Sequence, residues 1–333
     1  MKFLAFFAKE YTDGIELPFL LIYFATQMKQ LERIVFFGTP MFAANILDTL
    51  VMHKFPIVAV VTAPDKAAGR GMKASASAVK QIAEKHQIPV LQPEKLKSEA
   101  FVSTLQQINA DLNIVIAFRM LPEVVWQMPR LGTMNLHASL LPAYRGAAPI
   151  NWAIINGETQ TGLSTFFLKH AIDTGNVLLQ KTLPILEEDN AGSLHDKMMI
   201  EGAQLVVDSL NSIETGKYQL TEQVSGNFPH APKLNNDNCQ INWQLKASTI
   251  HNLIRGLSPY PSAYCRHNNK MIKLFKSKLT ELPSVSPGKF EIINKHHLMV
   301  HCADYCLEII ELQLEGKKRM QASEFINGFQ SII

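Results

Sequence analysis

Residues 34–38 read Ile34-Val-Phe-Phe-Gly38, a continuous apolar run that ends in glycine. A short run of this kind predicts a strand that is buried on both faces of a parallel sheet and is followed by a turn. Thr39 and Pro40 come next, and this pair is suited to cap and begin a helix, which we expect over residues 42–50. The segment therefore predicts the first strand and helix of an α/β domain.

The same alternation of apolar runs and helical patterns continues along the chain. Further strands are expected over residues 57–61, 89–91 and 112–117, separated by helices over residues 79–86 and 98–108. Strands that alternate with helices predict a parallel sheet with right-handed crossovers, in which ligands bind beyond the carboxyl ends of the strands. This alternation predicts a Rossmann-like fold. Gly38-Thr-Pro40 lacks the G-x-G-x-x-G fingerprint, so the sequence does not support NAD binding.

The remaining pattern predicts the end of this domain and a second one. Strands are expected over 162–168 and 177–183, and a long amphipathic helix over 193–210. A helix over 247–256 is followed by short strands over 271–275, 290–293, 298–302 and 306–314, a spacing typical of a small β-barrel. We therefore expect an α/β domain at 28–216, a polar linker at 217–238 and an OB-like β-barrel domain at 239–333.

The first 27 residues fit neither domain. Their apolar run Leu17–Ala25 spans only nine residues and contains Pro18, whereas a membrane-spanning helix needs about 20. Acidic residues precede the run and no small-residue cleavage site follows it, so a secretory signal is not indicated. Since Met28 begins a segment typical of a protein start, we expect residues 1–27 to be an extension outside the fold. A weak membrane-associating tail is the alternative.

Composition excludes several classes of protein. Hydrophobic residues make up 47% and charged residues 18%, which excludes a disordered, collagen-like or disulfide-dense chain. The net charge is only +3, but residues 231–333 hold 13 Lys and Arg against 8 Asp and Glu. This excess favours an anionic partner, although lysines that only confer solubility are the commoner explanation. The four cysteines form no C-x-x-C pair, so we expect free thiols in a cytoplasmic protein and no metal site.

The densest polar group in an apolar setting contains Asn135 and His137. If these residues end a strand, its period of two places both side chains on one face. An amide beside an imidazole can stabilise an oxyanion while a proton moves, although a hydrogen-bonded core asparagine and a structural histidine would give the same pattern. Asp173, in Ile172-Asp-Thr-Gly175, follows another expected strand and could pair with the histidine. Without a nearby cysteine or serine nucleophile, this trio suits direct acyl transfer to an amine.

Two long motifs carry a resemblance to a known family. The run N-L-H-A-S-L-L-P-A-Y-R-G-A-A-P-I at residues 135–150, followed by D-T-G at 173–175, resembles the folate-dependent formyltransferases. The likeness extends from about Glu32 to the C-terminus. It implies that Asn135, His137 and Asp173 are catalytic and that 10-formyltetrahydrofolate is the formyl donor, with no metal.

The resemblance also assigns residues to the folate. The loop that matches the folate-contacting segment of the family comprises Ser139, Leu140, Leu141 and Pro142. A second folate-wall segment follows the strand expected at 112–117. Here it comprises Phe118, Arg119 and Met120, where the family usually has A-Y-G. The departure affects the contacts with the pterin and leaves the chemistry unchanged.

The acceptor amine is indicated by a basic segment. The sequence P-D-K-A-A-G-R-G at residues 64–71 resembles an inserted loop of family members that act on initiator methionyl-tRNA in translation initiation. The basic residues expected to contact tRNA phosphates are Lys66, Arg70, Lys73 and Lys80. A solvated loop without this role is the simpler explanation for any one of them. A formyltransferase for a sugar-nucleotide amine and a non-catalytic tRNA-binding relative stay open as alternatives. We expect a monomer without a membrane partner.

Overall fold

The computed structural model describes residues 30–68, 73–268 and 270–329. The expected extension at 1–27 and Arg70 lie outside the described residues. Within those ranges no helix is both long and apolar enough to cross a membrane.

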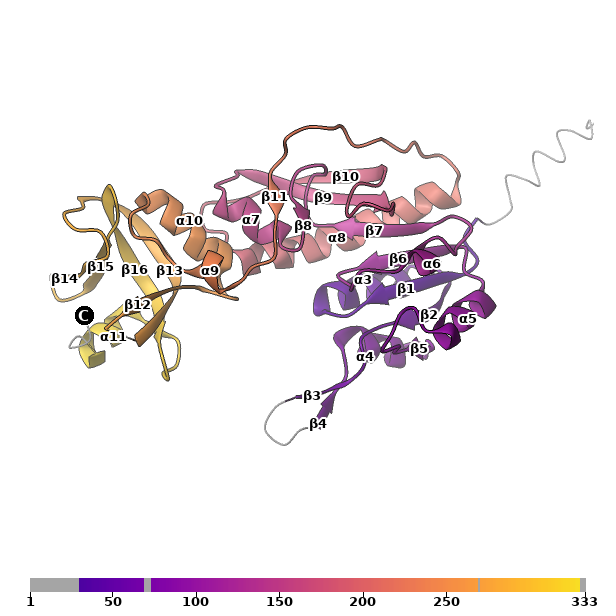
Figure 1. The fold of residues 1–333 in the computed structure, drawn as a ribbon, viewed down its shortest axis with the longest axis horizontal. Helices are drawn as coiled ribbons and strands as arrows, with labels where there is room; N and C mark the ends of the chain where they lie inside the picture. The colour runs from indigo at the N-terminus through magenta and orange to yellow at the C-terminus, as the bar shows by residue number, and fades with distance from the viewer. Residues whose placement is uncertain (1–29, 69–72, 269, 330–333) are drawn as a thin grey trace, which may run out of the picture.

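The first domain is built on one mixed sheet, which within the described residues has seven strands in the order β10-β9-β7-β6-β1-β2-β5 (Figure 1). Their bounds are Ile34–Gly38 (β1), Ile57–Val61 (β2), Val90–Leu91 (β5), Leu112–Ile116 (β6), Thr133–His137 (β7), Gln160–Phe167 (β9) and Val177–Pro184 (β10). The pairs from β5 to β7 are parallel, whereas β9 is antiparallel to both β7 and β10. This arrangement confirms the predicted Rossmann-like domain and adds a reversed strand beside β7.

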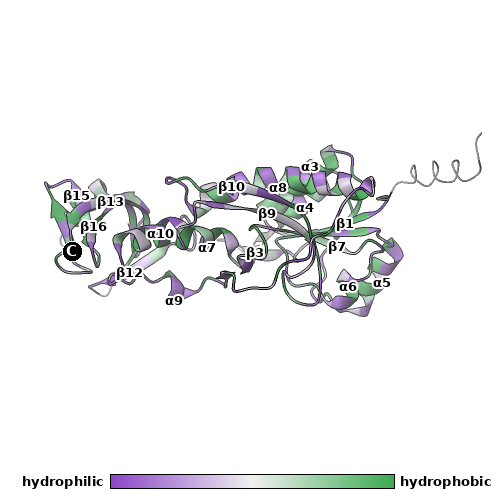
Figure 2. Cartoon of the chain, turned by 90° about the horizontal axis from the view of Figure 1, so that it is seen from above, coloured by the Kyte–Doolittle hydropathy of each residue, from purple (hydrophilic) through white to green (hydrophobic). Residues whose placement is uncertain are grey.

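Helices cover both faces of the sheet. β1 is apolar at every position before its glycine, so its side chains need to be buried on both faces. Ile34 and Phe36 pack in one core and Val35 and Phe37 in another, and all four are fully buried. Burying such a side chain contributes about 1.5–3 kcal/mol. The helices of the first core are α3 (Met41–Met52), α4 (Ala78–Lys85), α7 (Pro149–Ile155) and α8 (Ala191–Glu214), and those of the second are α5 (Glu99–Ile108) and α6 (Glu123–Trp126). Figure 2 shows α3 and α8 on one side of β1 and β7, and α5 and α6 on the other.

The second domain is a small antiparallel β domain with its own core, as the sequence predicts. Its strands run in the order β12-β13-β16-β15-β14, with β17 beside β16. The bounds are Ala263–His267 (β12), Lys270–Pro283 (β13), Phe290–Ile293 (β14), His297–His301 (β15), Tyr305–Leu314 (β16), Met320–Gln321 (β17), with helices Asn236–Cys239 (α9), Ala247–Leu257 (α10) and Ala322–Phe329 (α11). β13 extends well beyond the predicted 271–275, because its continuation pairs with β16 through irregular register shifts.

The two domains meet where α7 packs against α10. The amide of Asn151 donates to the carbonyl oxygen of Gly256 at 2.8 Å. A Cβ at Gly256 would lie 2.6 Å from Ile155 Cγ1, so glycine permits this close helix contact. Arg255 donates to the carbonyl oxygens of Leu186 and Asp189 at 3.0 and 3.2 Å. In Figure 1 the domains lie end to end along the long axis of the molecule, joined at this contact.

The segment predicted to be a linker, residues 217–238, runs back over the first domain (Figure 1). Thr221 forms an isolated antiparallel bridge with Val177. Farther on, β11 (His230–Ala231) pairs in parallel with β8 (Arg145–Gly146). The segment predicted to be a linker therefore also forms backbone hydrogen bonds with the motif-bearing loop at 144–148.

Candidate active site

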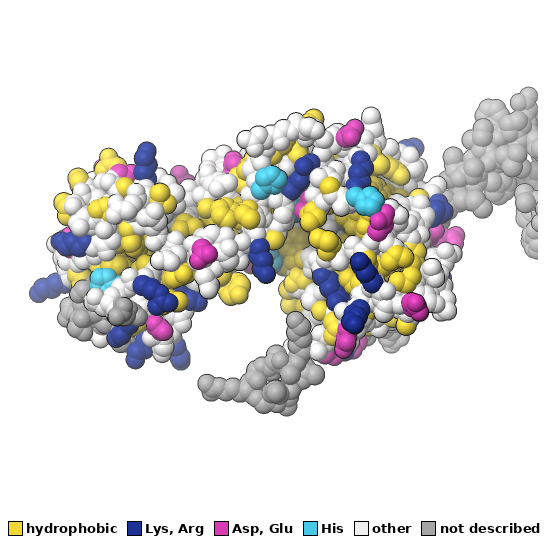
Figure 3. Space-filling model, viewed as in Figure 1, with side chains coloured by type: hydrophobic (Ala, Val, Ile, Leu, Met, Phe, Trp, Pro, Cys, Tyr) yellow, Lys and Arg dark blue, Asp and Glu magenta, His cyan; other side chains and the backbone are white. Residues whose placement is uncertain are grey.

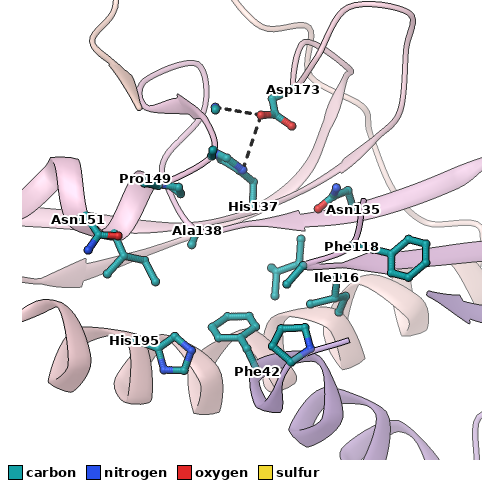
Figure 4. Close-up of a pocket in the computed structure, with 17 residues that line it drawn as sticks. Phe42, Ile116, Phe118, Asn135, His137, Ala138, Pro149, Asn151, Asp173 and His195 are labelled. Carbon is teal, nitrogen blue, oxygen red and sulfur yellow. Dashed lines mark hydrogen bonds and ion pairs between the residues drawn. The ribbon is translucent and has the colours of Figure 1, made fainter. Parts of the chain in front are cut away.

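A cleft of about 520 Å³ opens at the carboxyl ends of β1, β6 and β7. This is the place that open α/β sheets offer to ligands. The lining residues are Pro40, Phe42, Ile116, Ala117, Phe118, Asn135, Leu136, His137, Ala138, Gly146, Ala147, Ala148, Pro149, Ile150, Asn151, Asp173 and His195. Most of these side chains are apolar, and the few polar ones converge on the cleft (Figure 4).

Asn135 and His137 lie on β7, two residues apart, and both line the cleft. The spacing places them on one face of the strand, as expected from the sequence. Asn135 is half-buried, and within the described ranges its side-chain amide has no hydrogen-bond partner. Its N–H groups are therefore available to a bound molecule.

The imidazole of His137 is held in one tautomer. His137 is buried, and its Nε2 lies 2.8 Å from the carbonyl oxygen of Tyr144. A carbonyl oxygen only accepts, so Nε2 carries a proton and donates it. In the neutral ring Nδ1 then holds the lone pair, and this atom lies 3.9 Å from Oδ2 of Asp173. Nδ1 is therefore the atom that can take up a proton, with a carboxylate beside it to stabilise the resulting charge.

Asp173 reaches His137 from the turn between β9 and β10. Its backbone has a φ of +56°, in the left-handed region that few non-glycine residues adopt. Its Oδ2 accepts a hydrogen bond from the backbone N–H of Gly146 at 3.0 Å, and its side chain is 13% exposed. Figure 4 shows the carboxylate between this N–H and the imidazole. The fold thus brings together Asn135, His137 and Asp173, which lie up to 38 positions apart in the sequence.

The residues expected to form the folate wall after β6 are divided by the structure. Phe118 lines the cleft. Arg119 instead donates to the carbonyl oxygens of Pro93 and Glu94, and Met120 is 73% exposed. In this segment only Phe118 is thus among the cleft-lining residues.

The expected folate loop at 139–142 directly follows Ala138 and is buried or half-buried throughout. The cleft-lining set contains none of Ser139, Leu140, Leu141 and Pro142. Ser139 is fully buried and donates to the carbonyl oxygen of Ala143 at 2.6 Å, while the N–H of Leu141 donates to Ser164 Oγ at 3.0 Å. These bonds fix the loop that leads from His137 to Gly146, and the contact of residues 139–142 with the folate stays a prediction.

Of the basic residues expected to contact tRNA, Lys66 and Lys73 lie on a hairpin formed by β3 (Lys66–Ala68) and β4 (Lys73–Ser75). Figure 1 shows this hairpin projecting from the first domain. Lys80, on α4, contacts Asp65 Oδ2 at 2.5 Å and Gln92 Oε1 at 3.1 Å. The positive charge of Lys80 is therefore already paired with the carboxylate of Asp65. The hydrogen bond from Lys80 is also the main cause that lowers the pKa of Asp65.

Three cleft residues were not singled out from the sequence: Phe42 on α3, Asn151 on α7 and His195 on α8. His195 lies edge-on to Phe42, with ring centroids 5.3 Å apart, across the cleft from β7 (Figure 4). Asn151 directly follows the motif at 135–150, and His195 precedes Asp196 and Lys197. A polar residue at such a helical position does not by itself indicate that the fold turns it into the cleft.

None of the four cysteines lines the cleft. In the part of the chain that the structure describes, no group of three or more His, Cys, Asp or Glu is placed to hold a metal ion. All four cysteines are buried and free, as expected. Burial raises the pKa of Cys265 and of Cys302 to about 12, which keeps both as thiols.

Comparison with known proteins places this cleft in a family. The formyl transferase family model matches residues 32–210, and the model of the formyl transferase C-terminal domain matches residues 233–330. The methionyl-tRNA formyltransferase of Bacteroides fragilis is 49% identical over 89% of this chain and 95% of its own. That of Flavobacterium johnsoniae is 50% identical over 89% of this chain and 96% of its own. The chain belongs to the methionyl-tRNA formyltransferase family.

Solved structures of more distant proteins share the fold. WlaRD, a sugar 3N-formyl transferase crystallised with dTDP and 5-N-formyl-THF, superposes with a TM-score of 0.64 at 21% identity over 86% of this chain and 99% of that chain. HypX from Aquifex aeolicus in complex with tetrahydrofolic acid gives 0.62 at 17% identity over 89% of this chain and 47% of its own. The superposed part of this chain thus covers nearly all of WlaRD and about half of HypX.

Proposed function

We propose that this protein transfers the formyl group of 10-formyltetrahydrofolate to the α-amine of methionyl initiator tRNA, the step that prepares this tRNA for translation initiation. The observation that carries the proposal is the convergence of Asn135, His137 and Asp173 on one cleft, in a chain about half identical to methionyl-tRNA formyltransferases. The four free thiols suit a reducing compartment, so we place the reaction in the cytoplasm.

The cleft suits a folate. A flat heterocycle needs apolar walls and a few polar groups that fix its orientation. Phe42, Ile116 and Phe118 supply such walls next to Asn135 and His137. When bound, 10-formyltetrahydrofolate supplies a one-carbon unit already at the oxidation level of the product amide.

The catalytic trio divides the work of acyl transfer. As the amine attacks, negative charge develops on the formyl oxygen, and the amide of Asn135 has N–H groups free to donate to it. The attacking nitrogen must lose a proton, and Nδ1 of His137 is the atom able to accept it. Asp173 holds the imidazolium that results, because its Oδ2 lies 3.9 Å from Nδ1. As the new amide forms, the bond between the formyl carbon and N10 of the folate breaks, and the proton on Nδ1 is passed on to N10, so that tetrahydrofolate leaves.

The tRNA requires surface outside the cleft. Figure 3 shows Lys and Arg side chains gathered along one side of the second domain. We propose that this side, together with the basic segment of Lys66, Arg70, Lys73 and Lys80, contacts the tRNA backbone. Because Lys80 is paired with Asp65, we expect it to contribute least.

The test is a formylation assay on the purified full chain with 10-formyltetrahydrofolate and three acceptors. These are initiator methionyl-tRNA, elongator methionyl-tRNA and a sugar nucleotide that carries a free amine. We expect the highest kcat/KM for the initiator tRNA. Faster transfer to the sugar nucleotide would favour a sugar formyltransferase, and no transfer to any acceptor would indicate a non-catalytic tRNA-binding protein.

A further inference from the structure

One side chain of the interdomain segment 217–238 touches both loops that hold Asp173 in place. The amide nitrogen of Gln223 donates to the carbonyl oxygens of Asp173 and Gly175, each at 2.8 Å. Its amide oxygen accepts from Nε and Nη2 of Arg145, at 3.0 and 2.5 Å. Both N–H groups and both lone pairs of this amide are therefore used, within a half-buried site.

The two loops joined by Gln223 are the two that place the carboxylate of Asp173. One is the turn at 171–175, where Asp173 itself has a φ of +56°. The other carries Arg145 and Gly146, and the N–H of Gly146 donates to Asp173 Oδ2. A non-glycine residue keeps a left-handed backbone only where its surroundings hold it there. The two hydrogen bonds that Gln223 donates end on the carbonyl oxygens of Asp173 and Gly175, so they hold the backbone on the C-terminal side of Asp173.

Backbone hydrogen bonds from a later part of the same segment also hold the loop at 144–148. The N–H groups of Tyr144 and Ala147 donate to the carbonyl oxygens of Pro229 and Ala231, at 2.6 and 2.7 Å. The carbonyl oxygen of Tyr144 in turn accepts from His137 Nε2. The segment thus holds the partners of both His137 and Asp173 without contributing a side chain to the cleft.

We infer that Gln223 is a positioning residue for catalysis, and that it orients the carboxylate of Asp173 toward Nδ1 of His137. The expected loss of kcat rests on the proposed function, whereas the orientation of the Asp173 carboxylate does not depend on which substrate is bound. Gln223 does not line the cleft, so it acts through Asp173 and leaves the binding of folate and tRNA unaffected.

Removing the side chain should lower kcat and leave both KM values within about twofold. A displacement of a catalytic group by about 1 Å can cost up to roughly 100-fold, so we expect a loss of about 10-fold to 100-fold in Gln223→Ala. Gln223→Glu keeps the size and the contact with Arg145 but turns both donors into acceptors. We expect it to be at least as impaired as Gln223→Ala, because a carboxylate would face two carbonyl oxygens.

A double-mutant cycle distinguishes positioning from a general structural role. In an Asp173→Ala background there is no carboxylate to orient, so Gln223→Ala should change the single-turnover rate by less than about twofold. An equal loss in both backgrounds would overturn the inference, as would full activity of Gln223→Glu, which would assign the role to Arg145 alone. The matched control is Gln219→Ala, an exposed glutamine of the same segment, which should behave as the unmodified protein.

A second readout does not depend on the reaction. Hydrogen exchange of peptides that cover residues 144–148 and 171–176 should rise in Gln223→Ala and stay unchanged in Gln219→Ala, at an unchanged Tm. Unchanged exchange in Gln223→Ala would overturn the inference even if the enzyme is active. Conversely, increased exchange in a protein that formylates no tRNA would sustain the positioning of Asp173 and refute only the proposed function.

Discussion

The end of β7 and the basic segment at 66–80 serve the two halves of the proposed reaction, and they are built differently. At the strand end, His137 is buried with one nitrogen bonded and the other facing a carboxylate. In the basic segment Lys66 and Lys73 stand on a short hairpin, and Lys80 is held by an acidic neighbour. The first region holds the ring of His137 in a fixed position, whereas the second is a series of basic residues along the chain.

This difference predicts how each region responds to change. Groups that act on reacting atoms in a shielded cleft gain from low dielectric and from fixed geometry, so each one matters greatly. Surface charges that contact phosphates act additively, and salt screens them. The cleft should therefore show large effects on kcat, and the basic segment small effects that depend on ionic strength.

The largest effect is expected in the cleft. Asn135→Ala, His137→Ala and Asp173→Ala should each lower kcat by about 10²-fold to 10³-fold, because the first removes an oxyanion donor and the others remove or misplace the proton acceptor. Single-turnover formylation measures the loss, and thermal unfolding checks the fold. Asn211→Ala, on the exposed side of α8, is the matched control. Near-normal turnover in all three variants would show that the chemistry lies elsewhere.

An intermediate effect is expected where the motif loop meets the interdomain segment. A Cβ at Gly146 would lie 2.4 Å from the carbonyl oxygen of Ala231, and the φ of Gly146 is +127°. Gly146→Ala must displace the loop or β11, so we expect roughly a tenfold loss of kcat and a destabilisation of about 1–3 kcal/mol. The control is Gly216→Ala, where φ is +63° but no atom lies within 4 Å. Equal behaviour of the two variants in denaturant unfolding and kinetics would remove the steric explanation.

The smallest effect is expected in the basic segment. Arg70→Ala should weaken kcat/KM for tRNA a few fold and make the slope of log(kcat/KM) against log(salt) shallower by about one, as for the loss of one phosphate contact. Lys80→Ala is the comparison, since its ammonium is bonded to Asp65 and Gln92, and we expect no change of slope. Folate binding, measured by titration, should be unchanged in both. A defect of Arg70→Ala in folate binding alone would place this segment at the small-molecule site.

The second domain offers a contrast in predictability. Phe290–Ile293 has the bounds expected from the sequence, because this short, mostly apolar segment stands between turn residues on both sides. The strand expected at 271–275 instead extends over Lys270–Pro283. Its continuation alternates lysines with other residues, and only pairing with β16 makes such a stretch a strand.

The α/β domain, the small β domain and the three residues that we propose as catalytic could all be predicted from the sequence. Apolar runs such as 34–38 depend on local periodicity, and Asn135 and His137 share a face because a strand has a period of two. Three features could be seen only in the tertiary structure: the tautomer of His137, the orientation of Asp173 and the hydrogen bonds that Gln223 donates beside it. Phe42 and His195 enter the cleft for the same reason. Each of these contacts joins segments far apart in the chain, and such pairings leave no periodic signal in the residues around them.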